Sequence, residues 1–158
     1  MVSCFNRCAL FNAYEGKKRL FKRETCTLEL NELLNRVEQV NHDPYYLYYV
    51  KELIVFGSYV NTQDSKIHDL DIALDLEQKC DDRKFVMKKS SERVRASGKS
   101  LSFVNTIYYC YIETAKYLQN KSHILSLHDI DMYKKIKDDY GVHYGFDYEP
   151  VDIDTYNL

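Results

Sequence analysis

The 158-residue sequence predicts an α/β (α+β) fold in which a small mixed sheet is flanked by helices. Three short apolar segments, residues 50–56, 69–76 and 123–128, have the length and period of β-strands. Longer segments with helical period precede and follow them. The chain length suits one domain. We therefore expect a single domain over residues 1–158, in which residues 1–26 can form an arm and residues 138–158 an acidic tail.

Four segments are predicted to be helical. Residues 27–41 start at a threonine that suits an N-cap and end before a His-Asp-Pro sequence. Residues 81–97 are mostly charged, which indicates an exposed helix that Gly98 ends. The best apolar stripe in the chain predicts one long packed helix over residues 100–119. A short charged helix is expected at residues 129–137.

The first two strands carry the pattern on which the functional interpretation depends. Strand 50–56 is stopped by Gly57, and residues 58–64 are expected to form a turn or short helix. In strand 69–76, leucine and isoleucine alternate with Asp, Asp, Ala and Asp. One face of this strand should therefore join the core, while the other carries the carboxylates of Asp69 and Asp71.

Composition limits the classes of protein that fit. The formal net charge of −2 argues against a protein whose main task is to coat nucleic acid, although a local basic patch remains compatible with it. Five cysteines, without CxxC spacing or an N-terminal signal peptide, favour a cytoplasmic protein with reduced thiols. Charged residues interrupt every apolar segment before the ~20 residues that a membrane-spanning helix needs. We therefore expect no membrane association.

The segment Phe56-Gly57-Ser58-Tyr59, followed after a short spacer by Asp69-Leu70-Asp71-Ile72, resembles the signature of the DNA polymerase beta nucleotidyltransferase superfamily. That signature is a Gly-Ser turn after a strand and an Asp-x-Asp on the next strand. The match covers residues 50–76 and extends loosely through the strand at 123–128. The resemblance implies a mixed sheet of the nucleotidyltransferase type and transfer of a nucleoside monophosphate from an NTP to a hydroxyl, with release of pyrophosphate.

These residue types suit that chemistry. Gly57 lets backbone amides approach a phosphate, and Ser58 adds a hydroxyl at the start of a short helix. Asp69 and Asp71 can jointly hold Mg²⁺ or Mn²⁺, which would clamp the α-phosphate of the NTP. ATP is the expected nucleotide. Arg93 and Lys99 form a basic patch that could bind the triphosphate, the alternative being a solvated helix face.

The sequence departs from the family at the third carboxylate, which usually lies on a neighbouring strand and acts as the base. In strand 123–128, Leu125 and Leu127 should face the core, so Ser126 and His128 face the other way, and no residue there is acidic. His128 could serve as the base, or Asp129 could reach the site if the strand ends at His128. The alternative is that the third ligand is missing.

Two functions follow from the resemblance. The first is a nucleotidyltransferase whose acceptor, a protein, a tRNA or a small molecule, is not defined by the sequence. The second is a catalytically weak or inactive module that keeps the fold and acts through a partner protein, as in toxin–antitoxin or defence systems.

Overall fold

The structure is a computed structural model, and it describes residues 19–136 and 141–148. These residues form a mixed α/β fold, as the sequence predicts. The elements in chain order are β1 (Phe21–Lys22), α1 (Arg23–His42), β2 (Tyr48–Phe56), α2 (Ser58–Asn61), β3 (Lys66–Ile67), β4 (Leu70–Gln78), α3 (Arg83–Ser97), α4 (Phe103–Ile107), α5 (Tyr109–Gln119), β5 (Leu125–Asp129), α6 (Ile130–Ile136) and β6 (Val142–Gly145).

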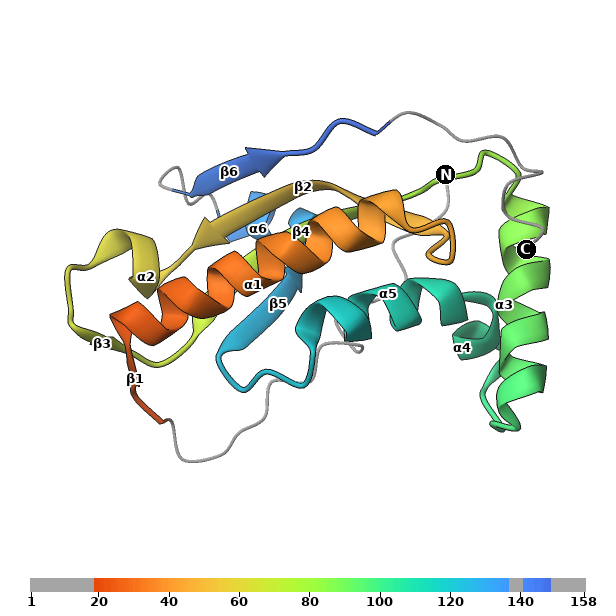
Figure 1. Cartoon of the computed structure of the whole chain (residues 1–158), viewed down its shortest axis with the longest axis horizontal. Coiled ribbons are helices and arrows are strands. Elements are labelled where there is room, and N and C mark those ends of the chain that lie inside the picture. The colour runs from red at the N-terminus through yellow and green to blue at the C-terminus, as the bar shows by residue number, and fades with distance from the viewer. Residues whose placement is uncertain (1–18, 137–140, 149–158) are drawn as a thin grey trace.

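The main sheet has four strands in the order β5-β4-β2-β6. β2 pairs antiparallel with both β4 and β6, whereas β4 and β5 are parallel. Parallel neighbours need a long crossover connection, and here α3, α4 and α5 form it. A separate two-stranded sheet joins β1 to β3. Figure 1 shows α2 and β3 at one end of the molecule and α3 at the other.

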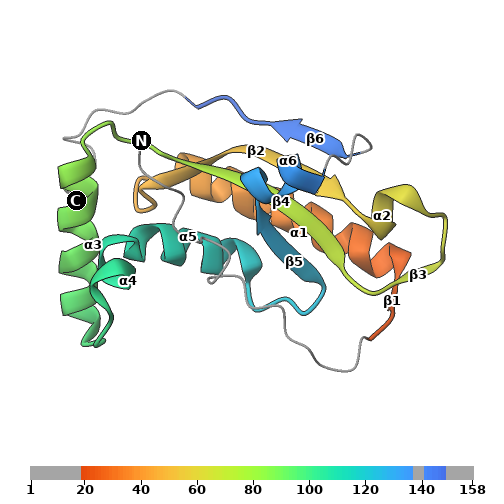
Figure 2. The ribbon, with the colours of Figure 1, turned by 180° about the vertical axis from the view of Figure 1, so that it is seen from behind.

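The two faces of the main sheet are covered differently. α1 and α5 lie over one face, and α6 lies over the other, as the views from opposite sides show (Figures 1 and 2). The larger core lies on the first face, where Leu53, Val55 and Ile72 pack with residues of α1 and α5. On the second face, Ile54, Phe56 and Ala73 pack against Ile130 and Tyr133 of α6. The second face also carries Asp71, so the candidate site lies on the side of α6.

The three predicted strands are confirmed, with shifted ends. β2 begins at Tyr48, two residues before the expected start, and β4 runs two residues beyond Leu76. The predicted alternation in β4 is correct, because its leucines and isoleucine are buried and its aspartates are only partly buried. β5 begins at Leu125 and includes Asp129, so the expectation that this strand ends at His128 is wrong.

α1 begins four residues before the predicted N-cap. Thr27 lies inside the helix, and its hydroxyl donates a hydrogen bond to the backbone carbonyl of Arg23, one turn earlier. Of the segment expected to form an arm, residues 21–26 belong to β1 and α1, and residues 1–18 lie outside the described part of the chain. The C-terminal end of α1 is as predicted, since Asp43 caps it immediately before the proline.

The long helix expected over residues 100–119 is divided in two. Ser102 caps α4 by accepting a hydrogen bond from the Asn105 amide, and Tyr108 has φ −91° and ψ 13°, outside the helical region, before α5 starts. Asn105 and the β-branched Thr106 and Ile107 are weak helix formers, which favours a break at this point. By contrast, α3 ends at Gly98 in a left-handed conformation, as predicted.

The expected acidic tail contains a strand that the sequence pattern did not predict. β6 pairs with β2 along Glu52 to Val55, at the edge of the sheet. Its sequence, Val-His-Tyr-Gly, is too short to display a period, so only the pairing with β2 defines it. In the described part of the chain, no helix combines the length and the apolar character needed to cross a bilayer.

Candidate active site

The site begins where β2 turns into α2. Phe56, the last residue of β2, pairs directly with Asp71 of β4, so the next residue, Gly57, lies beside the Asp71 carboxylate. Gly57 has φ +73°, and a Cβ on it would lie 2.4 Å from Asp71 Oδ2. The dihedral angle favours glycine, and a Cβ at this position would force the Asp71 carboxylate to move. The predicted Gly-Ser turn and the second aspartate are therefore in contact.

The four-residue helix α2 follows directly from this turn. The amides of Val60 and Asn61 donate to the carbonyl of Gly57, and the amide of Thr62 donates to that of Ser58. Ser58 is half-buried at the first position of α2. The sequence expectation of a turn or short helix after Gly57 is confirmed.

Arg23 holds the loop that follows α2. Its guanidinium donates to the backbone carbonyls of Tyr59, Thr62 and Asp64 at 2.6, 2.8 and 2.8 Å, and it lies 5.1 Å from the centre of the Tyr59 ring. Sequence reasoning missed this role, because Arg23 lies 36 positions before Tyr59 and no local pattern links the two.

His128 joins the site from the parallel strand β5. In the β4–β5 register, Asp71 pairs with Ser126 and Ala73 with His128. Nε2 of His128 lies 3.2 Å from Asp71 Oδ1 and 3.0 Å from Ser126 Oγ. The side chains of His128 and Asp71 are each 23% exposed, so solvent reaches both. The predicted orientation of Ser126 and His128, away from the core, is confirmed.

The contact with Asp71 restricts the protonation of His128. An ionised carboxylate only accepts hydrogen bonds, so a hydrogen bond between His128 and an ionised Asp71 needs the proton on Nε2. In the neutral imidazole, Nδ1 is then the basic nitrogen. The arrangement can thus hold a cation at Asp71 while His128 accepts a proton at Nδ1.

Asp71 lies within β4, whereas Asp69 lies just before this strand and Asp129 is the last residue of β5. Asp69 precedes β4, and its negative charge helps to raise the pKa of the buried Cys26 thiol in α1, after the larger effect of burial. Asp129 is nearly buried, falls on the alternation of Leu125 and Leu127, and accepts a hydrogen bond from the Asp131 amide at the start of α6. His128, rather than Asp129, is therefore the β5 residue beside Asp71.

A further acidic side chain follows along β4. Burial raises the pKa of the Asp75 carboxyl, with additional contributions from the negative charges of Glu77 and Asp129. Lys51 and Lys134 lower it. The face of β4 beyond Asp71 is thus acidic but partly neutralised by lysines.

Arg93 and Lys99 do not lie at this site. Arg93 forms an ion pair with Glu113 at 2.7 Å, donates to the Tyr45 carbonyl and lies over the Tyr45 ring. Lys99 donates to the Tyr109 hydroxyl at 3.1 Å. Arg93 lies in α3 and Lys99 follows that helix, and Figure 1 shows α3 at the opposite end of the molecule from α2, so the structure does not bring these two residues to the Gly57 turn. A charge pattern on a helix does not reveal which end of the sheet the helix packs against.

Among residues 19–136 and 141–148, no three His, Cys, Asp or Glu side chains converge in a way that could by themselves hold a metal ion. The predicted pair Asp69 and Asp71 would supply two protein ligands, and the substrate phosphates and water would supply the others. Comparison of the chain with protein-family models, with curated proteins and with solved structures finds no match.

Proposed function

We propose that this protein is a metal-dependent nucleotidyltransferase that moves a nucleoside monophosphate from an NTP to a hydroxyl acceptor. The observation that supports the proposal is the contact between the Gly57 turn and Asp71, with His128 on the next strand beside the same carboxylate. A phosphate-binding turn and a cation-binding carboxylate must be neighbours if one ion is to bridge protein and triphosphate.

The proposed roles follow from the chemistry of each group. Asp71 and Asp69 would hold Mg²⁺ or Mn²⁺, which would supply positive charge to the α-phosphate, and the Gly57-Ser58 turn would receive the terminal phosphates. His128 takes the proton of the acceptor hydroxyl at Nδ1, in the position where the resembling family has its third carboxylate. Pyrophosphate leaves as the acceptor oxygen bonds to the α-phosphorus, and a bound divalent ion would offset the negative charge on the leaving group.

Nucleotide binding should require both a divalent ion and the Asp71 carboxylate. We expect isothermal titration calorimetry to detect ATP binding in Mg²⁺ and to lose it in EDTA, because the triphosphate would then face bare carboxylates. Asp71→Asn should also lose binding and reduce transfer from labelled ATP by at least about 100-fold. Its melting temperature should hold or rise, since asparagine is nearly isosteric and can still accept from His128.

Asp75→Asn is the matched control, because it removes a carboxylate from the same strand and the same face, away from Gly57. It should leave ATP binding unchanged. Equal ATP binding in EDTA and Mg²⁺, or equal transfer by wild type and Asp71→Asn, would contradict the proposal.

The second candidate is the binding module without transfer. The specific observation that favours it is an imidazole, in place of a carboxylate, on the strand beside Asp71. This function predicts that the protein binds ATP in a metal-dependent way but gives no labelled product with protein, tRNA or small-molecule acceptors. That pair of results would favour it over transfer.

A further inference from the structure

Ser126 brings a hydroxyl into the candidate site that the proposed function leaves unused. In the β4–β5 register, Ser126 is the direct partner of Asp71. Its side chain is only partly buried, whereas its neighbours Leu125 and Leu127 are buried in the core on the other face of the sheet. The Ser126 hydroxyl therefore lies on the same face of the sheet as the Asp71 carboxylate and the His128 ring.

One nitrogen atom joins these three side chains. Ser126 Oγ lies 3.0 Å, and Asp71 Oδ1 3.2 Å, from Nε2 of His128. The two oxygens are consequently at most about 6 Å apart. A phosphate that shares a divalent ion with Asp71 must lie within a few ångströms of its carboxylate, because Mg²⁺–oxygen distances are about 2 Å. Ser126 thus offers a nucleophilic oxygen within the reach of such a phosphate.

The shared nitrogen decides which of the two hydrogen bonds forms. A neutral imidazole protonated at Nε2 donates to Asp71 and cannot accept from Ser126 at that atom. If the carboxylate engages a cation instead, the tautomer protonated at Nδ1 leaves Nε2 free to accept from the Ser126 hydroxyl. A serine hydroxyl that donates to an imidazole nitrogen is the arrangement in which a neighbouring base activates a nucleophile.

We propose that Ser126 is itself an acceptor, so that the protein transfers a nucleoside monophosphate to its own β5 strand. The inference rests on the proposed function, because the NTP must bind at Gly57 and Asp71. Ser126 Oγ bonds to the α-phosphorus, and the Ser126 proton passes to Nε2 of His128. The bond from the α-phosphorus to the oxygen that bridges to the β-phosphate breaks, and pyrophosphate leaves with that electron pair.

This self-transfer differs from transfer to an external acceptor in two respects. An external hydroxyl gives its proton to Nδ1 of His128, whereas Ser126 gives its proton to Nε2, so the two reactions use different tautomers. The phosphodiester formed on Ser126 also stays beside Asp71, its partner on the adjacent strand. Each chain should therefore react once, and the modified chain should bind a second ATP more weakly.

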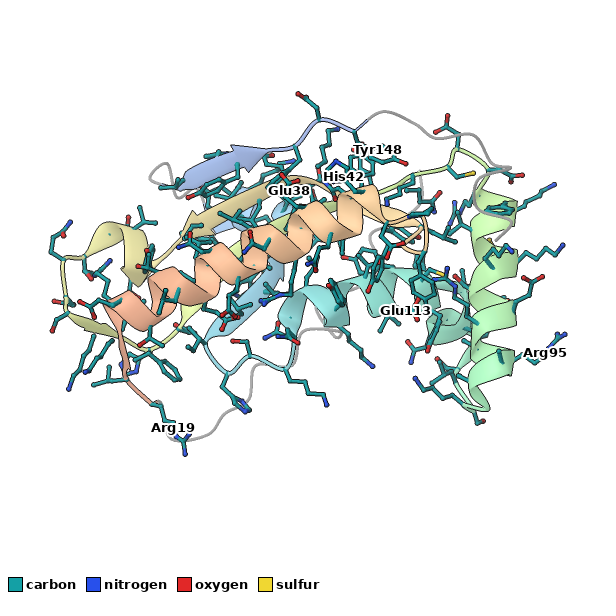
Figure 3. The ribbon with its side chains drawn as sticks, in the orientation of Figure 1. Arg19, Glu38, His42, Arg95, Glu113 and Tyr148 are labelled. Carbon is teal, nitrogen blue, oxygen red and sulfur yellow. The ribbon has the colours of Figure 1, made fainter. Side chains whose placement is uncertain are left out.

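Mass spectrometry of the full chain after incubation with ATP and Mg²⁺ tests the inference. We expect a gain in mass of a single AMP, and tandem mass spectrometry of the peptides should place it on Ser126. Ser126→Ala should lose this gain and still bind ATP in calorimetry. Ser100→Ala is the matched control, because it removes an exposed hydroxyl just beyond α3, whose Arg95 Figure 3 shows at the end of the molecule opposite α2. It should gain AMP as the wild type does.

A mixture of two variants tests whether the transfer occurs within one chain. Asp71→Asn keeps the Ser126 hydroxyl but lacks the carboxylate of the nucleotide site, whereas Ser126→Ala keeps the nucleotide site but lacks the acceptor. We expect no AMP on either variant in the mixture, because Ser126 lies beside the Asp71 of its own chain. AMP on the Asp71→Asn chains would show transfer between chains and would overturn the intramolecular step.

Nitrogen-15 NMR of the His128 ring gives a readout that needs neither ATP nor metal. Ser126→Ala should shift the Nε2 resonance more than the Nδ1 resonance, because the 3.0 Å contact is made at Nε2. The Ser100→Ala control should shift neither. Unchanged His128 resonances in Ser126→Ala would show that the serine does not bind the base, which would overturn the inference.

Failure of the proposed function and failure of this inference give separate results. If the wild type does not bind ATP in Mg²⁺, the proposed function is contradicted, and the reaction at Ser126 with it. If the wild type binds ATP but gains no AMP, gains it at another residue such as Ser58, or gains as much in Ser126→Ala, the inference alone is overturned.

Discussion

Gly57 lies so close to the Asp71 carboxylate that any side chain at residue 57 would have to displace it. Its positive φ adds a second reason, because L-residues rarely adopt that conformation. Gly98 has a similar φ of +66°, but no atom lies within 4 Å of the position that a Cβ would take. A substitution at Gly98 therefore tests backbone strain alone, whereas one at Gly57 tests strain together with steric contact.

Gly57→Ala should destabilise the protein by about 1–3 kcal/mol and weaken ATP binding, because the new methyl group displaces Asp71. Gly98→Ala should destabilise it by about 1 kcal/mol and leave ATP binding intact. Urea unfolding and calorimetry measure the two effects. Equal ATP affinity in Gly57→Ala and wild type would show that Asp71 moves without consequence.

Lys79 is a buried lysine whose ammonium group caps α1. It is 4% exposed, and its Nζ donates to the carbonyls of Val40 and Asp43 at 2.6 and 2.9 Å. Burial lowers its pKa to about 8, while the Asp43 carboxylate acts in the opposite direction. The unfolded chain therefore binds more protons than the folded chain between pH 8 and the ordinary lysine pKa of 10.5.

The free energy of unfolding should consequently rise with pH across that window, relative to a variant without the amine. Raised thiol pKa values of Cys26 and Cys110 act against this trend in both proteins, so the comparison must be with Lys79→Met. From pH 7.5 to 9.5, the free energy of unfolding of the wild type should rise by on the order of 2 kcal/mol relative to that of Lys79→Met. Parallel pH profiles in urea unfolding would contradict the lowered pKa.

The residue scale is where sequence reasoning located most of the candidate site. The alternation of strand 69–76 placed Asp71 on the face opposite the core, and the alternation of strand 123–128 placed His128 there too. It could not show that the parallel register brings His128 to Asp71, because register between distant strands depends on packing. The charge pattern could not show that Arg93 and Lys99 lie away from the Gly57 turn, because their partners, Tyr45, Glu113 and Tyr109, are set by tertiary contacts.

At the scale of elements, α2 is too short to hold its own position. Four residues give it few internal hydrogen bonds, and Arg23 of α1 binds the loop behind it through three carbonyls. We infer that α1 fixes the Gly57-Ser58 turn through this residue.

Arg23→Gln should increase amide hydrogen exchange across residues 58–65 and destabilise the protein by about 2 kcal/mol, because glutamine cannot serve three carbonyls. ATP affinity should fall with it. The neighbouring exposed Lys22→Gln serves as control and should change neither quantity. Unchanged exchange in Arg23→Gln would mean that α2 is held by its contacts with the sheet alone.

Helices and strands whose apolar pattern repeats over many residues could be predicted from the sequence. Elements that depend on contacts between distant residues could not. α1 and α3 followed from apolar spacing and end residues, whereas the break at Tyr108 depends on how α4 packs against α3 and α5. β6 is visible only through its pairing with β2. The first residues of β2 and β5 differ from the predicted ones by two positions for the same reason.

At the scale of the molecule, β6 completes the sheet by covering the β2 edge. The segment Leu-Ile-Val-Phe at the end of β2 is buried, and an open edge of this kind pairs readily with another chain. The stacking of Tyr148 on Tyr49, with ring centres 4.3 Å apart, also ties this region to β2.

A chain ending at residue 140 should therefore associate into larger species, because the β2 edge is left without a partner. A chain ending at residue 148 retains β6 and Tyr148 and should stay in the same oligomeric state as the full chain. Size-exclusion chromatography with light scattering compares the three. Identical elution of the 140-residue chain and the full chain would show that β6 is dispensable.

The late position of β6 has a consequence for synthesis. β2 ends at Phe56 and its edge partner begins at Val142, so a ribosome that adds 5–20 residues per second needs on the order of ten seconds to supply it. During that interval the nascent chain carries an apolar strand with one unpaired side. Neighbouring nascent chains on one messenger RNA can carry the same unpaired strand during that interval, so an open β2 edge can pair with a second chain before β6 is made.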